Sequence, residues 1–174
     1  LGVDHGAFDA AALAAEPGAG GLVLLPYFDG ERTPNLPDAT GTLTGLRTDV
    51  SREQLARAAV EGVVCSALDA LDALRHHVRV DGRLLICGGG AHSAAVRQVM
   101  ADLCDLPVEV VNADEAAAAG ACVQAAAVLT GADVGEVATR WGLGSGSVVG
   151  PTPAASARAD VRGGYATART RLHP

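Results

Sequence analysis

The chain has 174 residues, a mass of 17.4 kDa and a formal net charge of −7, from 13 basic and 20 acidic side chains. This length suits one domain with a hydrophobic core, and the 3% aromatic content means that leucine, valine and alanine must fill that core. All basic residues are arginines, so the chain has no P-loop lysine and no Schiff-base lysine. No basic stripe with interleaved aromatic residues is present, which argues against a nucleic-acid partner.

The first half of the chain predicts a short helix, two strands and one long helix. The short helix is expected over residues 9–16, before a proline-glycine pair, and apolar or alternating runs predict strands over residues 22–28 and 40–46. The long helix is expected over residues 51–76, because it opens on a serine-glutamine capping pair and keeps an apolar stripe at helical spacing.

The second half alternates strands and helices. Buried strands are expected over residues 84–87 and Val108–Val111, and a helix that Ser93 caps lies between them. An alanine-rich helix is expected from Asp114 or Glu115 to Thr130. A flexible Gly/Ser/Pro-rich loop or linker over residues 142–157 then leads to a terminal helix over residues 161–172. A right-handed crossover joins the two strands in parallel, so the order indicates an α/β layered domain.

The most informative segment is the glycine run Gly88, Gly89 and Gly90 between the first of these strands and the helix capped by Ser93. Glycines open turns that other residues cannot form, and the free amides of a helix start favour an anion. A nucleotide phosphate fits this pattern. The alternative is a tight strand-to-helix turn without a ligand, since short glycine motifs often occur by accident.

A dinucleotide-binding unit is a second alternative for the same segment. Its G-x-G-x-x-G fingerprint is incomplete, because the register starting at Gly88 places Gly90 second and Ser93 in the third glycine position. Two strands before a long helix also fit that fold poorly. The alternative is therefore a minor one.

Several motifs resemble the FGGY carbohydrate kinase family, and within it the xylulokinases. These are LPYFDGERTP at residues 25–34, GTLTGL at 41–46 followed after seven residues by QLARAAVE at 54–61, GGGAHS at 88–93 with the following Arg97, and NADE at 112–115 with the alanine-rich helix. They occur in the family's order from about Leu22 to about Leu129. The resemblance implies an actin-like ATPase (ribonuclease H-like) domain with a mixed sheet flanked by helices.

The resemblance also implies a reaction and a set of site residues. The reaction is phosphoryl transfer from ATP, with Mg²⁺, to a ketose, with D-xylulose giving the 5-phosphate. One wall of the ATP site is then formed by Gly88, Gly89, Gly90, Ala91, Ser93 and Ala94. His92 stands where the family usually has arginine or lysine, and Val96 stands where tryptophan is common, so side-chain contacts from these two positions are in doubt.

The family's amino-terminal domain, with its sugar pocket and catalytic aspartate, has no counterpart in these residues. We therefore expect residues 1–141 to form the nucleotide-side C-terminal domain, incomplete at its amino end, and residues 142–174 to form a loop and a terminal helix. No catalytic residue and no metal ligand is expected in the chain. Alone, it is expected to be inactive, and its exposed apolar surface could make it a homodimer. The alternative is a non-enzymatic, truncated or partner-dependent domain that binds nucleotide weakly or not at all.

Other residues have simpler interpretations. Glu31 and Arg32 either touch the substrate or the other domain at a cleft, or form a turn with a local ion pair. Glu61 is expected to have a structural hydrogen-bonding role, Asp102 to be solvated, and Trp141 to pack under the terminal segment. The four cysteines lack a C-x-x-C pair and are expected to be small buried side chains in a reducing cytoplasm. No apolar run reaches the roughly 18 residues of a membrane span, and no secretion signal is apparent.

Overall fold

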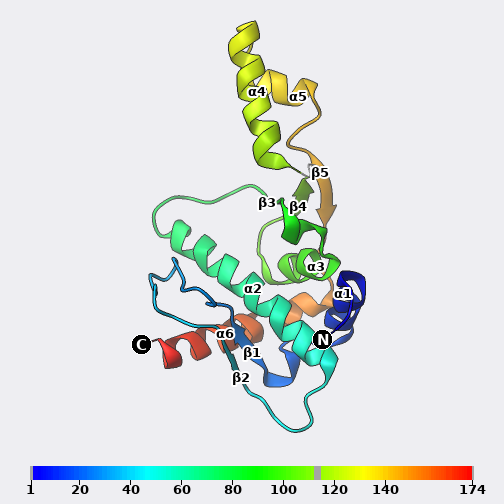
Figure 1. The fold of residues 1–174 in the computed structure, drawn as a ribbon, viewed down its shortest axis with the longest axis vertical. Helices are drawn as coiled ribbons and strands as arrows, with labels where there is room; N and C mark the ends of the chain where they lie inside the picture. Colours follow the sequence, from blue (N-terminus) through cyan, green and yellow to red (C-terminus); the bar gives the residue numbers. More distant parts are fainter. Residues whose placement is uncertain (1, 112–114, 174) are drawn as a thin grey trace.

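The computed structural model describes residues 2–111 and 115–173 (Figure 1). Three short 3-10 turns, at Ala19–Gly21, Gly89–His92 and Pro153–Ala157, connect the regular elements. Those elements are, in chain order, α1 (His5–Ala14), β1 (Val23–Leu25), β2 (Thr42–Thr44), α2 (Arg52–Arg75), β3 (Leu84–Ile86), α3 (Ala94–Leu103), β4 (Val108–Val111), α4 (Ala116–Thr130), α5 (Val134–Arg140), β5 (Gly146–Val149) and α6 (Arg158–Leu172).

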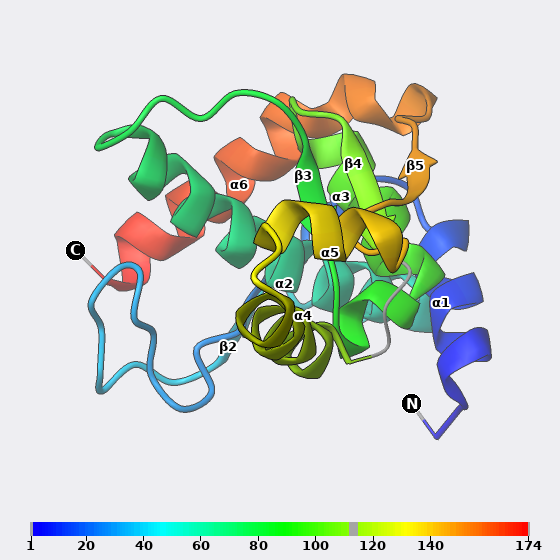
Figure 2. The ribbon, with the colours of Figure 1, turned by 90° about the horizontal axis from the view of Figure 1, so that it is seen from above.

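Two small sheets are present in the described part of the chain. β1 and β2 pair antiparallel, with Leu24 opposite Leu43. In the second sheet, of order β3-β4-β5, β3 and β4 are parallel and β5 is antiparallel to β4 (Figure 2). The fold is therefore α/β with a mixed sheet. The strand β5 is antiparallel, whereas the strands of a dinucleotide-binding unit are mostly parallel.

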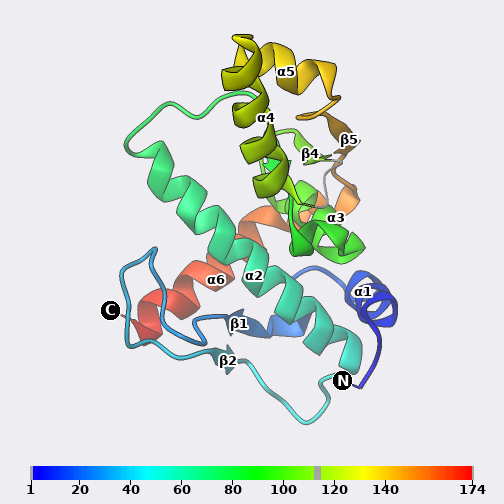
Figure 3. The same cartoon turned by 45° about the horizontal axis from the view of Figure 1, so that its top comes forward.

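The long helix α2 organises the core. Ser51 and Gln54 form the expected capping box, in which each residue's side chain bonds to the other's backbone N–H. The buried face of α2 packs on α1, α3, β1 and α6 (Figure 3). Its buried residues at helical spacing are Ala56, Val60, Val64 and Leu68. The apolar stripe predicted from the sequence coincides with this face only in part, because Ala58 and Leu68 are buried whereas Val63 and Leu74 are each 49% exposed.

A buried ion pair lies within α2. The Arg57 Nε donates to the Glu61 Oε1 over 2.6 Å, and both residues are at most 5% exposed. The same Glu61 oxygen accepts the backbone N–H of Gly18 over 2.9 Å, which ties the segment after α1 to α2. Glu61 therefore has the expected structural role.

The terminal helix α6 is held to α2 by arginine–carboxylate pairs. Arg162 bonds to both Asp69 and Asp72, over 3.1 and 2.5 Å, and Arg169 pairs with Asp69. Near the end of β1, the Tyr165 hydroxyl bonds to the buried Tyr27 hydroxyl over 3.2 Å. A helix distant in sequence thereby becomes part of the main core.

The segment 142–157 differs from the expected flexible loop. Residues Gly146–Val149 form β5, because the open edge of β4 supplies hydrogen-bond partners that the sequence pattern could not reveal. A Cβ on Gly146 would lie 1.7 Å from the Val110 carbonyl oxygen, so only glycine fits this close pairing. The helix α5 was also not predicted; it begins where the Asp133 carboxylate accepts the amides of Gly135 and Glu136.

Two single-residue expectations were wrong. Asp102 is 2% exposed rather than solvated, because its carboxylate accepts the backbone N–H and hydroxyl of Thr152 over 2.7 and 3.0 Å. These bonds fasten α3 to the segment that follows β5. Trp141 is 46% exposed and is not packed under the terminal segment, because it ends the helix α5, which packs on α4.

The expectation of four buried cysteines was half right, because Cys65 and Cys104 are buried whereas Cys87 and Cys122 are exposed. Burial raises the pKa of the Cys65 thiol to about 12, which keeps it protonated at neutral pH.

In a thiol-titration experiment at pH 8, we expect two fast equivalents from the native chain and two more after addition of denaturant. Replacing both Cys87 and Cys122 by serine should remove the fast phase. Four fast equivalents from the native chain would contradict this assignment.

Candidate functional site

The glycine run forms a sharp connection between β3 and α3. Gly88 has φ +80° and ψ −169°, a conformation that residues with a Cβ rarely adopt. Gly89–His92 then make a 3-10 turn, and Ser93 caps α3 by accepting the Val96 amide over 3.1 Å. The predicted strand, glycine turn and serine cap are all confirmed, with the 3-10 turn as an additional element between them.

The start of α3 already has an anion from within the chain. The Asp9 carboxylate on α1 accepts the Ser93 hydroxyl and the Ala94 backbone N–H, each over 2.6 Å. A carboxylate at a helix N-terminus compensates the unpaired amides and the helix dipole. Ser93 and Ala94 are thus engaged with α1 in this structure.

Asp9→Ala should lower the free energy of unfolding by about 1–3 kcal/mol, because it removes two charge-assisted hydrogen bonds at the start of α3. Urea unfolding followed by circular dichroism measures this loss. Asp4→Ala, which removes only the exposed cap of α1, is the matched control and should cost less. Equal losses in the two variants would contradict the role given to Asp9.

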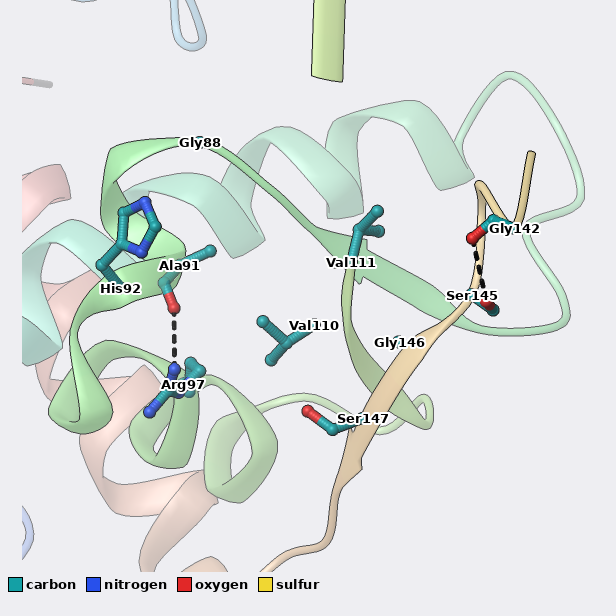
Figure 4. A pocket seen from close by; sticks show the side chains of 10 residues that line it. All are labelled: Gly88, Ala91, His92, Arg97, Val110, Val111, Gly142, Ser145, Gly146 and Ser147. Atoms are coloured by element: carbon teal, nitrogen blue, oxygen red, sulfur yellow. Dashed lines mark hydrogen bonds between the residues drawn. The ribbon is translucent and has the colours of Figure 1, made fainter. Parts of the chain in front are cut away.

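A pocket of about 520 Å³ opens beside the glycine turn (Figure 4). It lies at the carboxyl ends of the parallel strands β3 and β4, which is where open α/β sheets commonly bind ligands. Figure 4 shows Val110 directed toward the side of Ala91 and Arg97, with the β5 segment opposite. The pocket is lined by Gly88, Ala91, His92, Arg97, Val110, Val111, Gly142, Ser145, Gly146 and Ser147.

The described lining of this pocket favours an anion. Its titratable side chains are Arg97 and His92, and no carboxylate belongs to it among the described residues. The Arg97 Nη1 donates to the Ala91 carbonyl over 3.1 Å, which holds the guanidinium against the glycine turn. A planar guanidinium with further donors suits phosphate oxygens.

Neither the backbone conformation nor the packing of the described chain requires glycine at positions 89 and 90. Neither has a positive φ, and a Cβ built on either meets no atom of the described chain within 4 Å. Both are exposed on the turn and do not line the pocket itself, whereas Gly88 and Ala91 do. Open space at two consecutive glycines is what a ligand that approaches the backbone closely requires.

Glu31 is the centre of a loop rather than part of an ion pair with its neighbour. One carboxylate oxygen accepts the Arg32 and Thr33 amides over 2.7 and 3.1 Å, and the other accepts the Ser66 hydroxyl on α2 over 3.0 Å. These bonds engage Glu31 within the chain, and none of them is an ion pair with the Arg32 side chain. A contact of Glu31 or Arg32 with the substrate or another domain stays a prediction. The Arg32 side chain is exposed. Neither residue lines the pocket beside the glycine turn.

Sequence reasoning did not select several of the residues that line the pocket. Arg97 belongs to the glycine motif that resembles the family, but no function was predicted for it. Its position four residues after Ser93 places it on the first turn of α3, which was the available signal. The Gly/Ser stretch from Gly142 to Ser147 was interpreted as a linker, and its pairing with β4 is what brings it to the pocket.

Comparison with known proteins gives the family. The sequence profile of the C-terminal domain of the FGGY family of carbohydrate kinases matches residues 4–129. The chain belongs to this family. It is 46% identical over 137 residues to the xylulose kinase of Streptomyces coelicolor. The aligned region covers 78% of this chain and 28% of that relative.

Solved FGGY kinases share the fold. A xylulose kinase of Bifidobacterium adolescentis superposes with a TM-score of 0.74 at 39% identity, covering 97% of this chain and 32% of that one. A ligand-bound xylulose kinase of Lactobacillus acidophilus superposes with a TM-score of 0.84 at 26% identity, covering 95% of this chain and 34% of that one. The fold is thus that of the actin-like ATPases. This FGGY chain spans less than a third of the length of the Streptomyces coelicolor relative.

Among the described residues of this FGGY chain, no single helix is long and apolar enough to cross a membrane. In the described part of the chain, α4 and α5 pass such a test as a pair, and they are bent by 117° relative to each other. Nor do three or more histidine, cysteine, aspartate or glutamate side chains gather into a metal site in residues 2–111 and 115–173.

Proposed function

We propose that this chain is the ATP-binding part of a sugar kinase that phosphorylates D-xylulose to D-xylulose 5-phosphate. The observation that carries the proposal is the cationic pocket beside two glycines that the chain's own packing does not need. The substrate assignment is supported by the similarity to xylulose kinases at 46–47% identity. A cytoplasmic location follows for an ATP-dependent enzyme with four free cysteines.

The residues of the turn have two roles in this proposal. Gly88, Gly89, Gly90 and Ala91 form a wall against the nucleotide, and their lack of bulk lets the ligand approach the backbone. Arg97 supplies a cation to its phosphates. Ser93 and Ala94 are positioning residues, because their bonds to Asp9 hold the turn in place from α1.

Groups outside this chain complete the reaction in our proposal. ATP supplies the phosphoryl group, and Mg²⁺ accompanies the nucleotide, held by its phosphates and by residues of another domain. The catalytic aspartate and the sugar pocket also belong to that domain. This chain alone would then bind ATP, orient it and catalyse no transfer. Residues 1–141 would form the nucleotide-side domain, and 142–174, through β5 and α6, would complete its pocket and core.

An ATP-binding measurement with the 174-residue chain tests this proposal. Isothermal titration with ATP should give saturable binding, and Arg97→Gln should weaken it about tenfold or more, because a charge-assisted hydrogen bond contributes about 1.5–3 kcal/mol. Arg79→Gln is the matched control, since Arg79 is exposed and pairs with Asp81, and it should leave affinity unchanged. Absence of ATP binding, or equal effects of the two variants, would favour the non-enzymatic alternative.

A further inference from the structure

A second pocket, of about 330 Å³, lies between β1, α2 and α6. These three elements contact one another, and Figure 3 shows them together, away from α4 and α5. Among the described residues, none lines both this second pocket and the pocket beside the glycine turn. Small-molecule sites commonly have volumes of about 300–1,000 Å³. The second pocket is therefore large enough for a ligand of its own.

The titratable side chains of the second pocket are acidic or neutral. Glu61 and Asp160 are the acidic ones, and no arginine or histidine belongs to the lining in the part of the chain that the structure describes. Burial raises the pKa of the Cys65 thiol and of the Tyr165 hydroxyl, so both are neutral at pH 7. The rest of the lining is alanine, glycine, proline, leucine and valine. This combination argues against phosphates and carboxylates as ligands and favours an apolar body with a positive charge.

Glu61 offers an unused hydrogen-bond acceptor in this lining. It is 5% exposed, and its Oε1 accepts from both the Arg57 Nε and the Gly18 N–H. The other carboxylate oxygen, Oε2, has no hydrogen-bond partner among the described residues. A carboxylate can accept about four hydrogen bonds, and a buried oxygen is costly to leave unpaired. An N–H donor of a ligand in the second pocket would satisfy this oxygen.

Asp160 makes the second pocket negative overall. The charge of Glu61 is balanced by Arg57 in the buried ion pair. Asp160, in the first turn of α6, is exposed and forms no ion pair among the described residues. A cationic group that enters the pocket therefore approaches a negative charge that no side chain of the described lining offsets.

Packing does not explain one of the glycines in this lining. Gly62 has to be glycine, because a Cβ there would lie 2.4 Å from the Leu24 carbonyl oxygen. Gly164, within α6, has no positive φ, and a Cβ there would meet no described atom within 4 Å. Glycine destabilises a helix interior, so nothing in the local structure favours it at position 164. It leaves open space at the side of the second pocket.

We propose that the second pocket binds a small primary ammonium ion with a short apolar body. The ammonium group donates to the Glu61 Oε2 and is attracted by Asp160, and the apolar body lies against Val161 in the space beside Gly164. The ligand would hold α6 against α2, since both helices contribute to its site. This inference does not depend on the ATP-binding role.

Three six-carbon probes test the chemistry with the 174-residue chain. In calorimetric titrations, 1-hexylammonium should bind saturably at one site and at least tenfold more tightly than 1-hexanol, because charge-assisted hydrogen bonds are stronger than neutral ones. Hexanoate should show no binding, because its carboxylate would face two acidic side chains. Equal affinities for hexylammonium and hexanol, or no saturable binding of hexylammonium, would overturn the inference.

Gly164→Leu and its matched control Gly163→Leu locate the site. Both residues lie in α6 without a positive φ, and a Cβ on either meets no described atom within 4 Å, but Gly163 does not line the second pocket. Leucine is a better helix former than glycine, so both variants should unfold at or above the native midpoint. Gly164→Leu should weaken hexylammonium binding at least tenfold by filling the open space, and Gly163→Leu should leave it unchanged. Full affinity in Gly164→Leu would place the probe elsewhere and overturn the inference.

Asp160→Asn isolates the charge. It should weaken hexylammonium binding about threefold, the size expected for a partly exposed ion pair, and leave hexanol binding unchanged. Asp38→Asn is the control, because Asp38 is also exposed but lies outside the second pocket, and it should alter neither affinity. Equal effects of the two variants on hexylammonium would contradict recognition of its charge.

The result is distinguishable from the fate of the proposed function. Gly164 lines no part of the pocket beside the glycine turn, so Gly164→Leu should leave ATP affinity unchanged. Saturable hexylammonium binding by a chain that does not bind ATP would support the second pocket and contradict the ATP-binding role. Saturable ATP binding without hexylammonium binding would support the ATP-binding role and overturn this inference alone.

Discussion

Glu61→Ala is expected to lower the free energy of unfolding by about 3–5 kcal/mol, because it leaves a buried charge without its partner. Arg57 is 3% exposed, and its Nη2 already lacks a hydrogen-bond partner among the described residues. Removing Glu61 leaves this guanidinium buried without the carboxylate that lies 2.6 Å from its Nε. It also removes the acceptor of the Gly18 N–H, so the segment after α1 loses an attachment to α2.

Two further variants separate charge pairing from mere truncation. In the double variant Arg57→Met with Glu61→Leu, both charges are replaced by apolar side chains of similar size, and most of the lost stability should return. Asp49→Ala breaks the exposed ion pair with Arg47 and should leave the unfolding midpoint unchanged. Urea denaturation, with an unchanged dependence of the unfolding free energy on urea concentration, measures the stability of Glu61→Ala, of the double variant and of Asp49→Ala. If the double variant were as unstable as Glu61→Ala, the buried charge would not be the cause.

Gly89→Val is expected to abolish ATP binding while leaving the fold intact. The first carbon of the new side chain meets no atom of the described chain within 4 Å, so the free energy of unfolding should change by no more than about 0.5 kcal/mol. In the proposed site, the same side chain occupies space that the nucleotide needs. Isothermal titration should therefore show at least a tenfold loss of affinity, and the complete kinase should show a strongly raised KM for ATP.

Gly150→Val is the matched control for this substitution. Gly150 has no positive φ, and a Cβ at this position would also meet no described atom within 4 Å, but the residue follows β5 and is not part of the glycine turn. The two variants should have equal stability and differ only in ATP affinity. Unchanged ATP binding by Gly89→Val would remove the glycine turn from the nucleotide site, whatever the family of the chain.

Elements with strong local signals were predicted well. The capping pair at residues 51 and 54 and the apolar stripe behind it located α2, and the short apolar runs located β3 and β4. β5 was missed, because a Gly/Ser-rich strand has little periodicity of its own and forms only against the edge of β4. The seven-residue helix α5 was also missed, because it is too short for a clear helical period. The buried state of Asp102 was missed for a similar reason, since its partner Thr152 lies 50 residues away.

The candidate site was predicted in part. The glycine turn and the serine cap are local features that depend on a few consecutive residues, and they were found. Arg97 as a pocket cation and the Ser145–Ser147 wall depend on how separate segments meet, and they were not. The structural use of the Glu31 carboxylate was also not predicted, because its partner Ser66 lies 35 residues away on α2.

The family, the long helix and the glycine turn can be recognised from the amino-acid sequence, because motif order, apolar periodicity and glycine spacing are properties of consecutive residues. The folded structure was needed to show that Asp9, 84 residues from Ser93, bonds at the start of α3, that Arg97 lines the pocket, and that most of α4 is exposed. These features depend on contacts between distant segments. A local sequence pattern does not predict such contacts, since the two partners are distant in the sequence and meet only in the folded chain.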